Sequence, residues 1–211
     1  MIGTGDGRRP TMKVVHGGKP AERSASIPTG SDELRLRVQQ LSLREQIERN
    51  HFLLMRLNAA NARLIQSLEQ CDVFEAIAEI IGNLIGCEEI AVFDYHAGAQ
   101  TFSPAWSTGV EADALEPFLR GAGMMGRAVQ QGASQYQERQ PETSLLPYEK
   151  NLTACILLKT SSEIVGVVAL FGLLPQKNKL EWADFELLKF LEVYGAVAIK
   201  FQRLQRKQVS P

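Results

Sequence analysis

The cysteines and histidines are the side chains of this chain whose types most often carry catalysis or bind metals. Cys71, Cys87 and Cys155 are well separated, and no two cysteines form a C-x-x-C pair. Neither a zinc site nor a redox dithiol is therefore indicated. His51 and His96 are near neither each other nor a cluster of carboxylates. A histidine-based catalytic dyad or metal site has no support, so we expect no catalytic residues and no metal.

Each cysteine taken alone has a plain structural interpretation. Cys155 lies within an apolar run, where it is typical of a small core hydrophobe. Cys87 follows Gly86 at a predicted helix end, where it could be exposed and sense oxidants, but it has no basic neighbour to lower its pKa. The odd count of three fits a reducing compartment, so we expect a cytoplasmic protein.

Arg127 follows Gly123 and Gly126 at a predicted helix start. Its guanidinium and the neighbouring backbone N–H groups could hold an anionic ligand. An arginine at such a position is more often a solvated helix residue, and both interpretations stay open.

The longest predicted element is a helix over residues 32–70 that carries a heptad repeat. Its seam advances in steps of four and three from Leu36 to Leu68, which is the spacing of a coiled coil, so we expect a homodimer. Polar residues inside the seam cost stability but help to fix its register. The predicted dimerisation residues are Leu36, Leu43, Ile47, Asn50, Leu54, Leu57, Asn61, Leu64 and Leu68.

An alternative is that this helix packs on its own domain, which Ala59, Ala60, Ala62 and Ile65 near its end would suit. The positions that flank the seam show no clear charge code, so the sequence does not choose between a parallel and an antiparallel dimer.

Residues 71–206 carry the pattern of an α+β domain with a mainly antiparallel sheet flanked by helices. The expected helices cover 72–86, 112–119, 127–131 and 181–206, and the expected strands cover 89–96, 101–107, 134–137, 152–159 and 164–173. The last two strands are almost continuously apolar, which places them at the centre of the sheet. The closing helix is expected to turn inward Phe185, Leu188, Leu191, Val193, Ala196 and Ile199.

Composition limits the partners. The chain has 211 residues and a net charge of −1, which argues against binding nucleic acid or an acidic membrane surface. No apolar run is long enough to span a membrane. Residues 1–31 are rich in Gly, Pro, Ser, Lys and Arg, so we expect a disordered tail there and a second short tail at 207–211.

From about residue 66 to 204 the chain resembles a GAF domain, a sensory α/β module related in shape to PAS domains. Four stretches carry the resemblance: VFEAIAEIIGNLIG, GMMGRAVQQGAS, EIVGVVALFG and WADFELLKFL. The cyclic-nucleotide signature of the family is incomplete, because Asn178 and Lys179 stand in one loop and no Asp-Glu dipeptide follows Phe185. The chain also has no cysteine between Cys87 and Cys155 that could attach a bilin, as phytochrome-like members do.

The resemblance implies a ligand cavity beneath the segment that covers the sheet. Such cavities are apolar with few polar groups, but so are packed cores, and the same side chains could simply fill the interior. The candidate pocket residues are Phe93, Trp106, Met124, Met125, Arg127, Tyr136, Tyr148 and Cys155. The ligand and any cofactor stay unknown.

The resemblance implies a non-enzymatic regulatory module that senses a small molecule or docks a partner signalling protein and relays through a dimeric helix. A first alternative is a structural adaptor with a ligand-free GAF domain. A second is an enzyme, because some GAF-like proteins reduce free methionine sulfoxide with paired cysteines. That chemistry needs Cys87 and Cys155 to meet, which a helix end and a mid-sheet strand do not favour.

Overall fold

The computed structural model describes residues 30–136 and 146–209. Two compact units divide the chain, Met1–Arg44 and Glu45–Pro211. Most of the predicted tail at 1–31 lies outside the described residues. The tail predicted at 207–211 begins too early, because the last helix continues to Val209.

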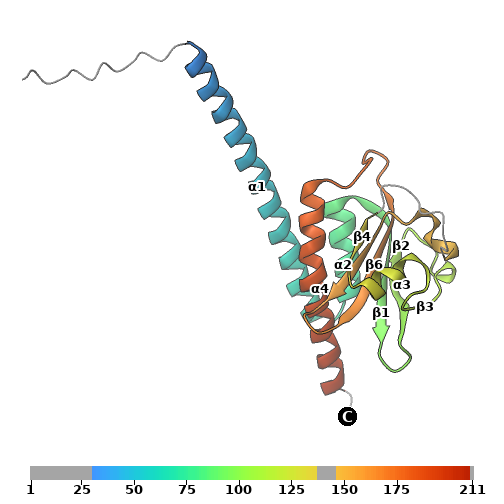
Figure 1. The fold of residues 1–211 in the computed structure, drawn as a ribbon. Coiled ribbons are helices and arrows are strands. Elements are labelled where there is room, and N and C mark those ends of the chain that lie inside the picture. Colours follow the sequence, from blue (N-terminus) through green and yellow to red (C-terminus); the bar gives the residue numbers. More distant parts are fainter. Residues whose placement is uncertain (1–29, 137–145, 210–211) are drawn as a thin grey trace, which may run out of the picture. The chain divides into compact units, whose positions relative to one another are not determined.

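A six-stranded antiparallel sheet forms the centre of the second unit, with the strand order β3-β2-β1-β6-β5-β4 (Figure 1). The strands are β1 (Cys87–His96), β2 (Thr101–Thr108), β3 (Phe118–Leu119), β4 (Gln135–Tyr136), β5 (Ala154–Lys159) and β6 (Ile164–Leu173). The predicted hairpin of two apolar strands is confirmed as β5 and β6, and β6 also pairs with β1. The predicted α+β class is confirmed.

The helices are α1 (Gly30–Gln70), α2 (Val73–Ile80), α3 (Gly123–Gln131) and α4 (Trp182–Val209). A π-helical turn, Ile81–Ile85, continues α2 up to Gly86, where a helix end was predicted. Two 3-10 turns cover Ala112–Ala114 and Pro147–Asn151. None of the described helices is both long and apolar enough to cross a membrane.

The helix predicted over 112–119 is wrong. Only the 3-10 turn Ala112–Ala114 forms there, and the chain is extended from Leu115 into β3. The reason is Pro117, which lacks a backbone N–H donor and disfavours a helical conformation at the preceding residue.

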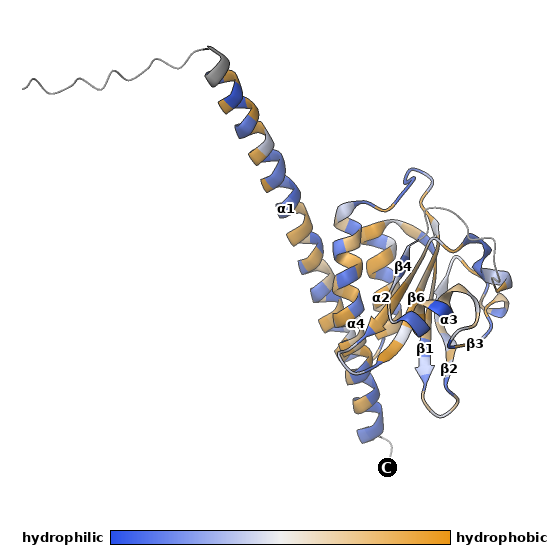
Figure 2. Ribbon diagram, viewed as in Figure 1, coloured by the Kyte–Doolittle hydropathy of each residue, from blue (hydrophilic) through white to orange (hydrophobic). Residues whose placement is uncertain are grey.

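Two hydrophobic clusters lie on the two faces of the sheet. The α4-side core joins the sheet to α1, α2 and α4 through residues such as Leu64, Ile77, Ile90, Val168 and Leu187. The α3-side core joins the sheet to α3 through residues such as Phe93, Phe118, Met125, Leu157 and Val167. Because both faces are covered, the central strands are hydrophobic along their length (Figure 2).

The second half of α1 packs on its own domain. Ala60 and Leu64 are buried in the α4-side core, and Leu57 and Leu68 are partly buried against it. Three residues of the predicted dimerisation seam are therefore used inside the chain, which is the alternative that the sequence left open. Of the four residues that the alternative placed against the domain, Ala60 is buried, whereas Ala59, Ala62 and Ile65 are exposed.

Candidate functional site

The α3-side core gathers most of the predicted pocket residues. Phe93 and Cys155 extend from β1 and β5, and Met124 and Met125 from α3, and all four are buried. Tyr148 is half-buried and packs against the same cluster from the 3-10 turn Pro147–Asn151. Five of the eight predicted residues thus meet on one face of the sheet.

Trp106 does not join them. It packs against the α4-side core, on the other face. The pairing of β1 with β2 shifts at one point, since Val92 pairs with Trp106 but Phe93 pairs with Pro104. This bulge skips Ala105 and turns Trp106 to the opposite face, because side chains alternate along a strand.

Tyr136 also stands apart from the cluster. Tyr136 is partly exposed on β4, where its ring meets Phe185 edge to face at a centroid distance of 5.0 Å. Burial and, to a lesser extent, the carboxylate of Glu192 raise the pKa of Tyr136 to about 12. Arg127 is half-buried on α3.

Aromatic rings fill the space between the sheet and its cover on the α3 side. Phe93 lies 5.2 Å from Phe118 edge to face and 6.3 Å from Tyr148 in a stacked arrangement. Phe102 stacks on Phe118 at 5.0 Å. The candidate pocket residue Phe93 therefore contacts both Phe118 and the candidate Tyr148, an arrangement that the packed alternative for this region expects.

Glu149 is a residue of this region that the sequence analysis missed. Its carboxylate is fully buried and accepts hydrogen bonds from the backbone N–H groups of Met124, Met125 and Leu146, each at 2.8 Å. It therefore occupies the start of α3, where Arg127 and the neighbouring N–H groups had been considered as a site for an anionic ligand. A signal was present in the sequence, because Pro147 and Glu149 are typical of the first and third positions of a helical turn.

Gly123 and Gly126 have separate roles at the start of α3. Gly123 has a φ of +63°, and a Cβ there would lie 2.4 Å from Oε2 of Glu149. A Cβ on Gly126 would lie 2.4 Å from the carbonyl oxygen of Leu119. At both glycines of the GMMG stretch another atom lies too close to leave room for a Cβ, so a residue with a side chain would not fit there.

The two buried cysteines lie on opposite faces of the sheet. Cys87 belongs to the α4-side core and Cys155 to the α3-side core. Cys87, which was considered exposed, is buried, and its thiol lies 3.0 Å from the carbonyl oxygen of Gly172. Burial raises the pKa of Cys87 to about 11, and burial also raises the pKa of Cys155. Both thiols are therefore protonated near neutral pH and are poor nucleophiles.

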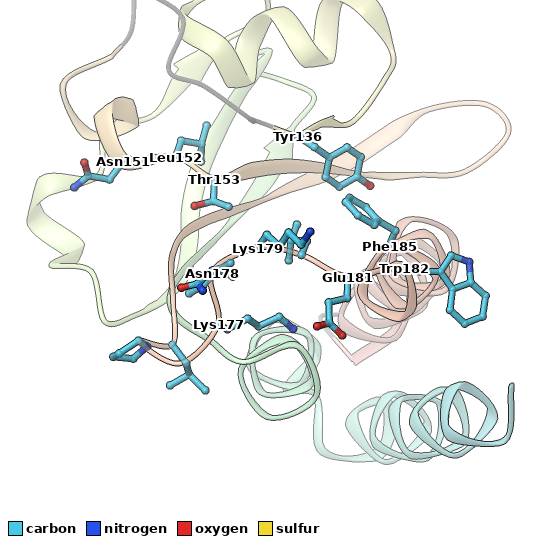
Figure 3. Close-up of a pocket in the computed structure, with 14 residues that line it drawn as sticks. Tyr136, Asn151, Leu152, Thr153, Lys177, Asn178, Lys179, Glu181, Trp182 and Phe185 are labelled. Atoms are coloured by element: carbon cyan, nitrogen blue, oxygen red, sulfur yellow. The ribbon is translucent and has the colours of Figure 1, made fainter. Parts of the chain in front are cut away.

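A surface groove of about 1440 Å³ lies at the end of the sheet beside the start of α4 (Figure 3). Its walls combine aromatic, aliphatic and basic side chains from β4, the 3-10 turn Pro147–Asn151, β6, α4 and the neighbouring loops. They are Tyr136, Asn151, Leu152, Thr153, Leu173, Leu174, Pro175, Lys177, Asn178, Lys179, Leu180, Glu181, Trp182 and Phe185.

A charge cluster lies behind this groove. The buried carboxylate of Asp184 pairs with Arg56 of α1 at 2.7 Å and with Lys177 of the groove at 2.6 Å. The same carboxylate accepts the backbone N–H of Glu181 at 2.8 Å and so caps the start of α4. Within the described residues, no group of three or more metal-binding side chains is present.

Helix α4 also exposes an apolar stripe, which we call the α4 seam: Phe190, Tyr194, Val197, Phe201 and Leu204. These positions advance in steps of four and three, and all but the partly buried Phe190 have between 45% and 58% of their surface exposed. Val193, which was predicted to face inward, is exposed beside them. The inward positions Leu188, Leu191, Ala196 and Ile199 are confirmed as buried.

Most of the predicted seam of α1 that precedes Leu57 is exposed as well. The exposed apolar positions in this part are Leu36, Leu43, Ile47 and Leu54, and the polar position Asn50 is exposed too. Asn61, which follows Leu57, is also exposed.

No family model matches the chain, and no curated protein matches it. Solved structures do match. The GAF domain of a phosphoenolpyruvate-protein phosphotransferase from Coxiella burnetii is 13% identical with a TM-score of 0.59, and the match covers 74% of this chain and 96% of that one. The GAF-B domain of DevS from Mycobacterium smegmatis is 16% identical with a TM-score of 0.52, and the match covers 65% of this chain and 98% of that one.

An enzyme also has this shape. The free methionine-R-sulfoxide reductase from Neisseria meningitidis is 13% identical with a TM-score of 0.54, and the match covers 71% of this chain and 89% of that one. At these identities the likeness shows the fold alone, and that fold is the GAF domain fold.

Proposed function

From the GAF fold, which is typically regulatory or sensory, we propose that this chain is a non-enzymatic regulatory module that works as a homodimer and passes signals through its helices to a partner protein. The observation that carries the proposal is the α4 seam. The domain's own core uses another side of α4, through Leu187, Leu191 and Ile199, and Phe190 is the seam residue that also packs against it. The exposed seam positions Tyr194, Val197, Phe201 and Leu204 therefore form a second apolar face on the helix.

The spacing of the α4 seam supports a second copy of the chain as its partner. Steps of four and three place the side chains along one stripe that another helix can meet with knobs-into-holes packing. A two-fold dimer uses the same patch on both subunits, and a stripe of this kind is self-complementary. Exposed apolar stripes of this length are typical of interfaces.

Helix α1 is proposed to contribute where its apolar residues are exposed. Leu36, Leu43, Ile47 and Leu54 remain available for a coiled coil, whereas Leu57, Leu64 and Leu68 contact their own domain. Residues 57–68 tie α1 to the sheet, so a change in the domain can be transmitted to the exposed half of the helix.

A ligand-free working mode is favoured over a small ligand on the α3 side, because aromatic rings and Met125 already fill that region. The groove in Figure 3 is the observation that favours a second candidate, a small-molecule sensor with its site beside Tyr136 and Phe185.

The reductase interpretation has less support. Cys87 and Cys155 lie on opposite faces of the sheet and both have raised pKa values, so they are poorly placed to act as nucleophile and resolving thiol. Turnover of free methionine sulfoxide with a dithiol reductant would establish that activity and refute a non-enzymatic role.

Sedimentation equilibrium tests the proposal. The wild-type chain should be a dimer, and Tyr194→Glu combined with Val197→Glu should be a folded monomer, because two carboxylates cannot be buried unpaired in the seam. Lys189→Glu, an exposed change on the same helix, should stay dimeric. A wild-type monomer at micromolar concentration would overturn the proposal.

A further inference from the structure

The buried carboxylate of Glu149 is held as a bound anion would be held. Both of its oxygens accept hydrogen bonds, Oε1 from Met125 N–H and Oε2 from the N–H groups of Met124 and Leu146, all at 2.8 Å. Two of these three donors are successive N–H groups in the first turn of α3, where the helix dipole favours a negative charge. Hydrogen bonds of this length to an ionised oxygen are among the stronger ones in proteins.

The place that receives the carboxylate is shaped for it. The Cβ that any other residue would add at Gly123 would lie 2.4 Å from Oε2 and 2.8 Å from Oε1 of Glu149. The left-handed φ of +63° at Gly123 also favours glycine. The room left by the missing Cβ of Gly123 and the N–H donors at the start of α3 therefore match the size and the charge of a carboxylate group.

A second contact fastens the same short segment, residues 146–151, which we call the strap. The Tyr148 ring stacks on Phe93 at 6.3 Å, and its hydroxyl donates to the carbonyl oxygen of Glu116 at 2.9 Å. Burial, and after it the charge of Glu149, raises the pKa of Tyr148, so the hydroxyl stays a donor. The strap thus brings an anion and an aromatic ring to the α3 side of the sheet.

We propose that the strap is an internal ligand of this domain. Glu149 fills an anion site at the start of α3, Tyr148 covers the adjoining apolar surface, and the α3 side of the sheet is closed to free ligands while the strap is in place. This inference deepens the proposed function and rests on its ligand-free working mode. A molecule that enters from this side must carry a carboxylate-like anion and must displace the strap.

An internal ligand differs from an ordinary buried charge in one testable way. If the N–H groups of Met124 and Met125 form an anion site of their own, a free anion will bind there once the side chain of Glu149 is removed. Acetate is the matching probe, because Glu149→Ala removes one methylene group and one carboxylate.

Thermal unfolding of the full-length chain in potassium acetate, against potassium chloride at equal ionic strength, is the experiment. Glu149→Ala should lower Tm by roughly 5–10 °C, since charge-assisted hydrogen bonds are lost. Acetate should raise the Tm of this variant saturably and leave wild type unchanged. The matched control is Glu149→Gln, which fills the same space with a neutral amide and should be destabilised without rescue by acetate.

An unchanged Tm for Glu149→Ala, or an equal effect of acetate on all three proteins, would overturn the inference. Hydrogen exchange on wild type covers the case in which the alanine variant does not fold. The amides of Met124, Met125 and Leu146 should exchange as slowly as those of the central strands, and fast exchange would show that Glu149 does not hold them. Sedimentation tests the dimer without reference to the strap, so the two proposals can fail separately.

Discussion

The guanidinium of Arg56 lies 2.7 Å from the carboxylate of Asp184, although 128 residues separate them in the chain. Both side chains are buried, and Arg56 also donates to the carbonyl oxygen of Leu84. Because Asp184 caps the start of α4 and also binds Lys177, one carboxylate joins α1, the groove and α4. In the proposed relay, this is the contact through which a change at the groove would reach α1.

The first prediction concerns this ion pair. Asp184→Asn should lower the free energy of unfolding by about 3–5 kcal/mol, because it leaves the buried Arg56 without its carboxylate. Urea unfolding at pH 7 measures the change. The matched control is Glu186→Gln, which breaks an exposed pair with Lys189 and should cost at most about 1 kcal/mol. Equal losses for the two variants would show that the buried pair has no special role.

The second prediction concerns the centre of the sheet. Val168 is fully buried on β6, so Val168→Asp should unfold the domain or cost about 4 kcal/mol or more, since an unpaired carboxylate is expensive there. Leu119→Asp, at an exposed position of β3, should be nearly neutral. Circular dichroism melting curves compare the two. A normal melting temperature for the Val168 variant would contradict the core described above.

The third prediction concerns pH. The pKa of Cys87 is raised in the folded chain from 9.0 to about 11, so the folded state holds this proton more tightly than the unfolded state does. The stabilisation is complete below about pH 9 and is lost as the pH rises toward 11, so the free energy of unfolding should fall over this window.

Cys87→Ser replaces the thiol near Gly172 by a hydroxyl group, which can still donate a hydrogen bond but does not titrate in this range. Urea unfolding from pH 8 to 11 should therefore show a shallower decline for the variant than for wild type. Cys71→Ser, at an exposed cysteine, is the control and should leave the wild-type slope. Identical slopes for all three proteins would refute the prediction.

The fourth prediction separates the two uses of α1. Leu57 packs on its own domain and Leu54 is exposed. Leu57→Ala should lower the free energy of unfolding by about 1–3 kcal/mol, because it opens a gap against the α4-side core. Leu54→Ala should leave the fold intact and weaken the dimer.

Sedimentation velocity over a range of concentrations, with urea unfolding of the same samples, measures both quantities. If Leu57→Ala instead weakened assembly as Leu54→Ala does and left the free energy of unfolding unchanged, the seam would be the continuous coiled coil that the sequence suggested.

The sequence alone determined the elements with a strong local signal. The apolar runs at 154–159 and 164–173 specified the central hairpin, because strands covered on both faces must be apolar throughout. The heptad spacing specified a long helix ending near Gln70, and the order of motifs pointed to the GAF fold.

Only the tertiary structure decided which faces meet. The bulge at Ala105 moved Trp106 to the other side of the sheet, and no period in the sequence marks one skipped residue. The burial of Leu57, Leu64 and Leu68 was decided in the same way, because a heptad stripe is equally suited to a second helix or to the helix's own domain.

The role of Glu149 could not be predicted from the sequence for a related reason. A buried carboxylate is favourable only when distant N–H groups converge on it, and that convergence exists only after α3 and the strap have packed together.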